Sequence, residues 1–407
     1  MTAAPTRPTI LQLIPRLETG GAERTVVEVC AAITRAGGRA LVAAQDGRMA
    51  RDVRSAGGEI IPLPMASKNP VQIIANARRL VQLIKSERID LLHARSRAPA
   101  WSALFAARRA RVPFVTTFHG AYSERGRIKR LYNSVMSRAD RIIANSQFTA
   151  NVVRTRYGTD SARISVIHRG IDPAAYNATA IAPERLAALR AAWGISPETR
   201  VVLTAARLSP PKGQATVIDA AGRLGLAFPG AQDAASPVVF ILAGDAQGRD
   251  DYMRDLDARI AAHRLGGIVK RVGYVGDMPA AYALAYVALM PSTYPEAFGR
   301  ASIEAQASGV PVIASRLGAP PESVRAAPDV AAGTETGWLV PPGDADALAG
   351  ALAEVLAMSA EAYAAMAERA RHNATTNFTL ARLQSQTLAV YDSLLDTHLA
   401  ADFERSA

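Results

Sequence analysis

Short apolar runs alternate along the chain with longer stretches in which apolar residues recur every three or four positions. Such runs are typical of strands buried in a parallel sheet, and the intervening stretches are typical of helices covering its faces. The pattern therefore predicts an α/β fold of repeated strand–helix–strand units. In the first half it predicts helices at 22–36 and 71–86, and strands at 9–14, 39–44, 59–62, 91–93, 114–118, 141–144 and 163–167.

The second half of the chain repeats the pattern. It predicts strands at residues 201–205, 237–243, 287–290, 310–314 and 338–340, and helices at residues 299–308, 344–356, 360–373 and 380–399. Two successive sets of alternating strands and helices predict two doubly wound α/β domains.

A turn-rich segment, residues 168–173, separates the two halves and is typical of an interdomain hinge. We predict a first domain at residues 1–170, a second at 171–375, and a C-terminal helix at 376–407 that returns to the first domain. Ligands of open α/β sheets bind beyond the carboxyl ends of the strands. Two such domains predict a cleft, with the chemistry on loops that follow strands.

Composition narrows the class of protein. Hydrophobic residues make up 49% of the chain, enough for a full core in each domain. No stretch approaches the roughly 18 uninterrupted apolar residues of a membrane-spanning helix, and residues 1–8 lack the apolar core of a signal peptide. A single cysteine, Cys30, leaves no partner for an intrachain disulfide. These features predict a cytoplasmic protein.

The net charge of +11 is unevenly distributed. Residues 1–180 carry 28 Lys and Arg against 12 Asp and Glu, whereas the remainder carries 19 against 24. The first half is therefore expected to meet a negative partner, such as anionic lipid headgroups or a phosphorylated acceptor. A solvated basic surface explains the same count. The arginines are scattered and form no nucleic-acid-binding module, so no nucleic-acid partner is expected.

The most informative segment starts the predicted helix at residues 299–308. Glu296 precedes the helix and Glu304 lies about two turns into it. The backbone N–H groups of a helix N-terminus form a site for phosphate, here those of Phe298, Gly299, Arg300 and Ala301. A carboxylate on each side can hold hydroxyl groups of a sugar and a ribose. The alternative is a helix-start acid favoured by the helix dipole, with Glu304 on the surface.

Two cations, Arg207 and Lys212, flank a loop after the first strand of the second domain, so both can reach a bound anion. A metal ion is the usual alternative to such cations, held by a short acidic motif. The chain has two Asp-x-Asp motifs, but residues 344–346 are predicted to cap a helix and residues 255–257 to lie within one. No metal and no cofactor are therefore expected.

Two further candidates follow strands of the first domain. His119 comes directly after the predicted strand at residues 114–118, where a structural histidine is the alternative interpretation. Gly20 and Gly21 lie where the first strand turns into its helix, so that backbone N–H groups can approach a ligand closely. They do not form a dinucleotide fingerprint, because Ala22 and Thr25 stand where further glycines are needed. The absence of this fingerprint argues against a nicotinamide-dependent oxidoreductase.

Together these segments resemble glycosyltransferase family 4, a family of retaining glycosyltransferases with the two-domain GT-B fold. The segment from Pro295 to Ala305 is similar to its E-x7-E motif. Matches in order and spacing are Gly20–Arg24, Phe118-His119-Gly120, Arg207 with Lys212-Gly213, Leu242–Asp245, and Gly309–Ala314. The Pro-Glu-Ala-Phe-Gly-Arg form, with residues 277–282 upstream, is similar to bacterial members that build surface polysaccharide or lipopolysaccharide core.

The resemblance implies a nucleotide-sugar donor and a saccharide or lipid-linked saccharide acceptor. It implies that Glu296 orients the hydroxyls of the donor sugar, Glu304 binds the ribose, and His119 contacts the reacting sugar. Arg207, Lys212 and the helix start would then hold the diphosphate. The chain departs from the family at the hinge, where His168-Arg169-Gly170 replaces the usual Pro-Asn-Gly. Arg271 replaces an aromatic residue next to the nucleobase pocket assigned to Arg271 and Val272.

A basic segment with interleaved aromatic residues follows His119 and contains Arg125, Arg127, Lys129 and Arg130. It is a candidate surface for an anionic acceptor or for peripheral docking on the inner face of a membrane, with a solvated helix face as the alternative. The rival functions are a nucleotide-sugar epimerase, a sugar phosphorylase, and a non-catalytic nucleotide-sugar-binding protein.

Overall fold

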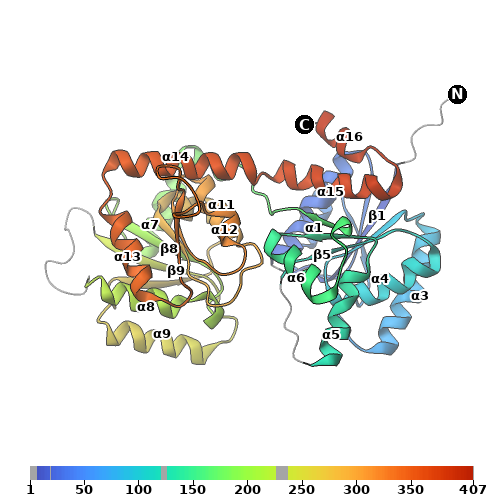
Figure 1. The fold of residues 1–407 in the computed structure, drawn as a ribbon, viewed down its shortest axis with the longest axis horizontal. Helices are drawn as coiled ribbons and strands as arrows, with labels where there is room; N and C mark the ends of the chain where they lie inside the picture. Colours follow the sequence, from blue (N-terminus) through green and yellow to red (C-terminus); the bar gives the residue numbers. More distant parts are fainter. Residues whose placement is uncertain (1–6, 19, 121–125, 226–236, 407) are drawn as a thin grey trace. The chain divides into compact units, whose positions relative to one another are not determined.

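The computed structural model describes residues 7–18, 20–120, 126–225 and 237–406 and divides into two compact units. The first unit comprises Met1–Arg169 together with Leu380–Ala407, and the second comprises Gly170–Thr379. Each unit is a doubly wound α/β domain built on its own parallel sheet (Figure 1). The divisions fall at 169/170 and 379/380, beside the sequence-based boundaries at 170/171 and 375/376.

The first sheet has seven strands in the order β3-β2-β1-β4-β5-β6-β7, all paired in parallel. The central strands are buried on both faces because helices cover the sheet on both sides. The strand order steps outward in both directions from β1 and β4, so the loops after these strands meet at one edge. The strands are β1 Thr9–Arg16, β2 Arg39–Gln45, β3 Glu59–Pro62, β4 Leu91–Ala94, β5 Phe114–Phe118, β6 Arg141–Ala144 and β7 Ile164–Val166.

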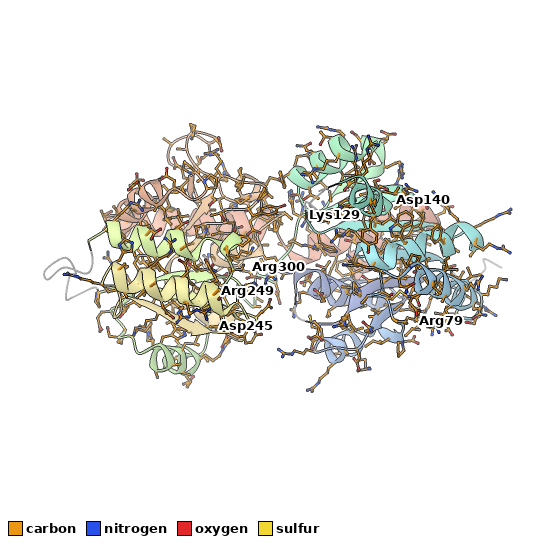
Figure 2. The ribbon with its side chains drawn as sticks, turned by 90° about the horizontal axis from the view of Figure 1, so that it is seen from below. Arg79, Lys129, Asp140, Asp245, Arg249 and Arg300 are labelled. Atoms are coloured by element: carbon orange, nitrogen blue, oxygen red, sulfur yellow. The ribbon has the colours of Figure 1, made fainter. Side chains whose placement is uncertain are left out.

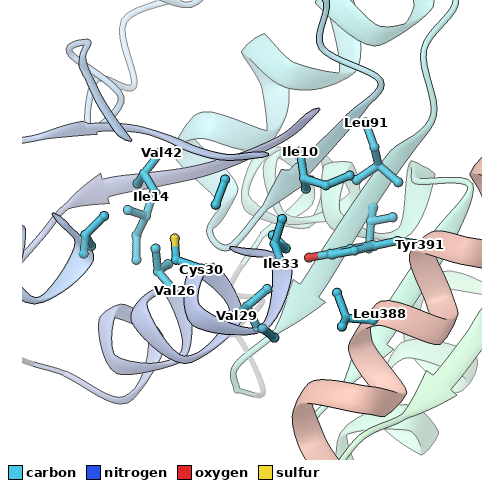
Figure 3. Close-up of a cluster of buried hydrophobic side chains, with 14 of the residues drawn as sticks. Ile10, Ile14, Val26, Val29, Cys30, Ile33, Val42, Leu91, Leu388 and Tyr391 are labelled. Atoms are coloured by element: carbon cyan, nitrogen blue, oxygen red, sulfur yellow. The ribbon is translucent and has the colours of Figure 1, made fainter. Parts of the chain in front are cut away.

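Helices from both ends of the chain complete this unit. They are α1 Gly21–Arg35, α2 Ala50–Ser55, α3 Pro70–Ser86, α4 Arg97–Ala110, α5 Arg127–Asn133, α6 Gln147–Tyr157, α15 Leu380–Leu395 and α16 Leu399–Arg405, with short 3-10 turns η1 Ser134–Arg138 and η2 Ser161–Arg163. Leu388 and Tyr391 of α15 pack into the same apolar cluster as Val29 and Ile33 of α1 and Ile10 of β1 (Figure 3). The C-terminal helices therefore share the core of the first unit.

The second sheet has six parallel strands in the order β10-β9-β8-β11-β12-β13. The strands are β8 Arg200–Ala205, β9 Val238–Ala243, β10 Val269–Gly273, β11 Ala285–Met290, β12 Val312–Ser315 and β13 Gly337–Val340. Its helices are α7 Pro183–Trp193, α8 Gln214–Arg223, α9 Asp250–Ala262, α10 Met278–Leu284, α11 Arg300–Ala307, α12 Pro320–Ser323, α13 Ala345–Leu356 and α14 Ala360–Asn377, with turns η3 Ala178–Ala180 and η4 Pro210–Lys212. Strands β8, β11 and β12 are neighbours, which places their loops side by side.

The predicted strands are all present, but two sequence-based expectations were wrong or incomplete. The predicted helix at residues 380–399 is broken into α15 and α16, because Asp396 takes a left-handed backbone conformation. The Asp392 carboxylate accepts hydrogen bonds from the backbone N–H groups of Leu399 and Ala400, at 2.8 and 2.9 Å, and so starts a new helix. Strand β10 was not predicted, since its residues Lys270 and Arg271 interrupt the apolar pattern.

Among the residues that the structure describes, no single helix has both the length and the apolar character of a membrane span. Helices α13 and α14 together satisfy those criteria but are bent by 112° to each other, and α13 contributes Leu348 and Leu352 to the second core.

Candidate functional site

Three loops of the second unit converge on Glu296. They follow β8, β11 and β12, which are adjacent in the sheet. Lys212 Nζ, from the β8 loop, donates to Glu296 Oε1 at 2.5 Å, and Ser292 Oγ donates to the same oxygen at 2.5 Å. The backbone of Glu296 pairs with the β12 loop, accepting from the Ala319 N–H at 2.9 Å. Glu296 is thus held by contacts from three loops, its carboxylate by Lys212 and Ser292 and its backbone by the β12 loop.

Two glycines make this convergence possible. Gly213 has φ +74°, and a Cβ there would lie 1.9 Å from the carbonyl oxygen of Pro291 in the β11 loop. Gly318 has φ +91°, and a Cβ would lie 2.3 Å from the carbonyl oxygen of Glu296. Both positions require a left-handed backbone and lack room for a side chain. The loops can therefore touch backbone to backbone, which holds Lys212 and Glu296 in register.

The β8 loop is held from inside by Gln214, which is fully buried. Its side-chain amide donates to the carbonyl of Arg207 at 3.0 Å, and its Oε1 accepts from Tyr252 at 3.0 Å. The Thr293 N–H also donates to the Pro211 carbonyl at 3.0 Å. Lys212 is half-buried at the end of this loop, whereas Arg207 is exposed. The two cations thus differ in how tightly they are placed.

Helix α11 begins next to this loop cluster. Gly299 is its N-cap residue with φ +88°, and a glycine has no side chain with which to cap the helix. The Phe298 ring is buried and packs on Phe378 with 5.8 Å between ring centroids, which fixes the chain as it enters the helix. Ala301 lies in the first turn and packs against the core. An uncapped helix start beside a fixed ammonium group is suited to bind an anion.

Glu304 lies on α11, where its carboxylate accepts from Arg300 Nε at 3.3 Å. Both side chains are mostly shielded from solvent. Tyr282 is buried beneath them, and burial, together with the Glu304 carboxylate, holds the pKa of its phenol well above the ordinary value. Glu296 and Glu304 therefore stand before and within the same helix, each held by one cation.

A hollow of about 540 Å³ lies beyond the ends of β9 and β10, lined by residues that include Gly244, Asp245, Arg271 and Tyr274. Asp245 and Arg249, labelled in Figure 2, belong to the segment between β9 and α9. Arg271 Nη2 donates to Asp257 of α9 at 2.5 Å.

Val272 does not line this hollow and instead packs on an apolar cluster of the second unit. Consecutive residues of a strand point to opposite faces, so the side chains of Arg271 and Val272 cannot share one pocket. Gly244 is essential nearby, since a Cβ would lie 1.9 Å from the Ala206 carbonyl oxygen. Of the two residues assigned to the nucleobase, only Arg271 lines this hollow.

In the first unit, His119 follows β5 and is contacted by Arg169, the last residue of the unit's N-terminal segment. Arg169 Nη2 donates to His119 Nδ1, and Nη1 donates to Thr25 Oγ1 of α1 at 2.6 Å. Burial lowers the pKa of His119 well below its ordinary value, and the nearby guanidinium groups of Arg169 and Arg95 lower it further. The imidazole is therefore neutral and oriented by an arginine.

The two glycines at the start of α1 differ. Gly20 has an extended backbone, and a Cβ there would meet the Glu23 carboxylate at 2.4 Å. Gly21 is the first residue of α1 and has open space where a Cβ would stand. The Gly21 carbonyl accepts from Thr25 Oγ1 at 2.8 Å, which links this turn to Arg169 through Thr25.

A second buried polar cluster adjoins His119. His93 Nδ1 lies 2.6 Å from Tyr391 Oη and its Nε2 lies 2.7 Å from Thr117 Oγ1. Arg95, buried at the end of β4, donates through Nη2 to Gln12 Oε1 at 2.5 Å. These groups tie α15 to the centre of the first sheet.

The basic segment after His119 forms α5. Arg127, Lys129 and Arg130 are exposed on it, together with Ile128, which is 86% exposed; Arg125 lies outside the described residues. Lys129 is labelled in Figure 2. A hollow of about 1010 Å³ lies beside the helix and is lined by six arginines, Arg108, Arg127, Arg130, Arg138, Arg156 and Arg163. None of the described residues that line it is acidic.

The carboxylates of both Asp-x-Asp motifs make other contacts, with a helix start or with arginines. Asp344 caps α13 by accepting from the backbone N–H groups of Asp346 and Ala347, and Asp257 pairs with Arg271. Within the described ranges, no three His, Cys, Asp or Glu side chains are placed to share a metal ion.

Sequence reasoning missed several residues that hold these groups. Ser292, Gly318, Thr25 and Arg169 were not site candidates, although Arg169 was noted as an unusual charge at the hinge. Gly318 could have been found from the sequence, because a glycine soon after a strand indicates a place where two loops approach closely. Ser292 and Thr25 carry no such signal, because their roles depend on loop conformation.

Two doubly wound Rossmann-like domains with polar loops at the strand ends define the GT-B class of glycosyltransferases. A family model described as Glycosyltransferase Family 4 matches residues 19–175, and one described as Glycosyl transferases group 1 matches residues 187–373. The chain belongs to glycosyltransferase family 4.

Solved structures agree over nearly the whole chain. A glycosyltransferase from Rickettsia africae is 27% identical, covers 97% of this chain and all of its own, and has a TM-score of 0.85. Anabaena HepE in complex with UDP-glucose is 28% identical, covers 95% of this chain and 100% of its own, and has a TM-score of 0.79. The D-inositol 3-phosphate glycosyltransferase of Mycobacterium tuberculosis is 34% identical over 196 residues. That match spans 47% of this chain and 37% of the relative.

Proposed function

We propose that this glycosyltransferase transfers a hexose-type sugar, with retention of anomeric configuration and without a catalytic metal, from a nucleotide-sugar donor to an anionic saccharide or lipid-linked saccharide. The similarity of its motifs to those of bacterial members favours a role in lipopolysaccharide core or surface polysaccharide synthesis. The observation that carries the proposal is the Lys212–Glu296 pair, fixed by three loops beside the uncapped start of α11.

The donor diphosphate binds at this start in the proposal. The Lys212 ammonium and the first N–H groups of α11, at Gly299, Arg300 and Ala301, neutralise the charge that grows on the diphosphate as the glycosidic bond breaks. Glu296 accepts hydrogen bonds from sugar hydroxyls, and Glu304 from those of the ribose. Arg207 is exposed and free to swing toward the phosphates. Arg271 faces the hollow beyond β9 and β10, which is suited to the nucleobase.

The proposed reaction retains configuration because the acceptor attacks from the side on which the diphosphate departs. The acceptor oxygen bonds to the anomeric carbon, the bond from that carbon to the diphosphate oxygen breaks, and the acceptor proton passes to a donor phosphate oxygen. His119 donates a hydrogen bond to the reacting sugar. No carboxylate in this scheme becomes covalently bonded to the sugar.

The relatives support the donor class. Anabaena HepE has been crystallised with UDP-glucose and with UDP and glucose, which makes a UDP-hexose the first donor to test. The name of the mycobacterial relative describes transfer to inositol 3-phosphate, an acceptor that carries a phosphate. The six arginines beside α5 are suited to such a negative acceptor or to an anionic membrane surface.

The donor is identified by thermal shift with UDP-, GDP- and ADP-sugars, since a ligand that binds the folded state raises the melting temperature. The selected donor is then incubated with lipid-linked and phosphorylated saccharides, and the anomeric configuration of the product is read by NMR. Equal turnover with EDTA and with added Mg²⁺ is expected. An inverted product, or turnover that requires an added divalent ion, contradicts the proposal. Conversion of the donor sugar without an acceptor would identify an epimerase instead.

Membrane docking is tested by sedimentation with vesicles of phosphatidylcholine alone and with 30% phosphatidylglycerol. The double variant Arg127→Ser and Arg130→Ser is expected to lose the binding specific to anionic vesicles. The matched control, Arg78→Ser and Arg79→Ser on α3, removes the same charge from another helix of the same unit. Equal loss in both variants would assign binding to net charge rather than to the α5 face.

A further inference from the structure

Arg169 joins three parts of the first unit. It follows β7, donates through Nη2 to His119 Nδ1 after β5, and donates through Nη1 to Thr25 Oγ1 on α1. The residue is 6% exposed. A buried arginine with two directed hydrogen bonds has little freedom to move, so the groups that accept from it are held in one orientation.

The contact with Arg169 decides where the imidazole proton of His119 lies. Arginine has only donor groups and stays protonated at any physiological pH. His119 Nδ1 must therefore be the acceptor, and the proton of the neutral ring must be on Nε2. The Nε2 atom is itself buried and has no hydrogen-bond partner among the residues that the structure describes. The arrangement presents one N–H donor of fixed direction.

The surroundings keep this ring neutral. The charged and titratable groups acting on it are Arg169 and, from β4 and its end, His93 and Arg95. Glu28 of α1 and Tyr391 of α15 act on Arg95. A second proton on His119 would face the Arg169 guanidinium directly at Nδ1.

We infer that Arg169 is a positioning residue that fixes His119 as the neutral Nε2–H tautomer, so that Nε2 donates to the donor sugar. The donor-sugar part rests on the proposed function; the tautomer part does not. The hinge residue that distinguishes this chain from the usual Pro-Asn-Gly thereby acts on the site through His119.

The tautomer is measured directly by long-range ¹H–¹⁵N NMR on ¹⁵N-histidine-labelled protein, with His119→Gln used to assign the signal. In the wild type we expect a protonated Nε2 and an unprotonated Nδ1 from pH 8 down to pH 6. In Arg169→Met we expect a mixture of tautomers and a His119 pKa above that of the wild type, although burial and Arg95 still hold it below the ordinary histidine value. Arg169→Lys, which keeps a cationic donor, restores the wild-type pattern. Arg141→Gln alters another arginine that contacts backbone in this unit and leaves the signal unchanged.

Turnover provides the second measurement. Arg169→Met is expected to lower kcat by roughly 10- to 100-fold, the loss seen when the partner that orients a metal-ligating histidine is removed, with a smaller change in KM. It should also move the acid limb of the pH–rate profile to a higher pH than in the wild type, because one of the groups that lower the His119 pKa is gone. Arg169→Lys recovers most of kcat and returns the limb to its wild-type position, whereas loss of a residue needed only for folding would lower the amount of active protein without moving the limb.

The role of Arg169 in fixing the tautomer and the contact of His119 with the donor sugar can be disproved independently. A wild-type Nδ1–H tautomer, or an unchanged tautomer in Arg169→Met, overturns the role of Arg169. If the tautomer depends on Arg169 but His119→Gln transfers sugar at the wild-type rate, the positioning stands and the proposed contact of His119 with the donor falls.

Discussion

The polar groups at the carboxyl ends of the two sheets are stabilised in opposite ways. In the second unit, cations and carboxylates pair directly and remain partly exposed, as in Lys212–Glu296 and Arg300–Glu304. In the first unit, buried cations donate to neutral acceptors, as Arg95 does to Gln12 and Arg169 does to Thr25 and His119. One end carries charge that a ligand can reach, and the other carries charge that orients neutral groups.

Physical chemistry explains what each arrangement can do. A partly exposed pair contributes little to stability, so its members can change partners when a phosphate or a hydroxyl binds. A buried arginine has lost its hydration, and losing its acceptors as well would cost several kcal/mol. Its hydrogen bonds are therefore directional and persistent. The second unit is built to exchange contacts with a charged ligand, and the first to hold a neutral donor group still.

The largest effect is expected from removing either member of the partly exposed Lys212–Glu296 pair. Glu296→Ala and Lys212→Ala should each lower kcat/KM by about 100- to 1000-fold, the cost typical for removing a group that stabilises charge in the transition state. Both variants should unfold close to the wild type, because the pair is partly exposed. Steady-state kinetics with saturating donor and urea unfolding measure the two quantities.

Arg254→Ala is the matched control, since it breaks an exposed ion pair on α9, away from the loop cluster. It should leave both kinetics and stability near the wild type. Full activity of either loop variant at saturating donor would contradict the roles given to Glu296 and Lys212.

The next largest difference is expected between alanine substitutions at two glycines, Gly213 in the second unit and Gly21 in the first. Gly213→Ala places a methyl group against the Pro291 carbonyl at a left-handed position, and should destabilise the second unit by about 2–4 kcal/mol. Gly21→Ala meets open space at a helix start, and should change the stability of the first unit by at most about 1 kcal/mol. Hydrogen exchange along a urea series reports each unit through its own peptides.

Gly21→Ala also tests the proposed close approach of a ligand to that turn. If it lowers kcat/KM at unchanged stability, the missing side chain serves a ligand. Unchanged activity would assign Gly21 to the turn alone. A mild Gly213→Ala would mean that the β8 and β11 loops are less tightly packed than the contact requires.

The stability of the two units should also depend differently on acidic pH. Burial, followed by nearby positive groups, lowers the folded-state pKa of both His93 and His119. The unfolded chain therefore binds more protons below about pH 6.5, so stability falls as the pH falls. Each histidine contributes a slope of about 1.4 kcal/mol per pH unit between its unfolded and folded pKa values. The second unit has only half-exposed His263 and exposed His372.

We expect β4 and β5 peptides to lose exchange protection between pH 6.5 and 5.5 before β8 and β9 peptides do. His93→Gln should reduce the slope of the first unit by about half, because one of the two histidines with a lowered pKa is gone. Parallel loss in both units would mean that acidic groups common to both dominate.

The sequence predicted the sheets well because their inner strands are buried on both faces. Residues 237–243 form one apolar run that only a covered strand explains, and β9 lies there. The sequence-based prediction missed a strand at the edge of the second sheet, where the apolar pattern is weaker. Strand β10 is at the sheet edge, and Lys270 satisfies its charge by donating to the carbonyls of Trp193 and Gly194, both at 2.8 Å. The residues around Lys270 do not indicate that its partner, Gly194, lies 76 residues away in the sequence.

The same limit applies to the candidate site. Motif spacing predicted that Lys212 and Glu296 belong to one site, and the structure joins them directly. It could not predict that Ser292 shares the same carboxylate oxygen, since that depends on the turn between them. Arg271 and Val272 were assigned together because they are adjacent in sequence, yet a strand sends adjacent side chains to opposite faces. Whether they bind a nucleobase stays a prediction.

The smallest effect is expected from Asp344→Ala, which tests whether this carboxylate of the second unit is structural rather than part of the site. Asp344 accepts from the N–H groups of Asp346 and Ala347 at 3.0 and 2.9 Å, so Asp344→Ala should cost about 1 kcal/mol of stability. Asp346→Ala should cost less, because its side chain is exposed and pairs with half-exposed Arg223. Transfer rates of both variants, with and without Mg²⁺, should match the wild type. A rate loss that added Mg²⁺ reverses would instead make this motif a metal ligand.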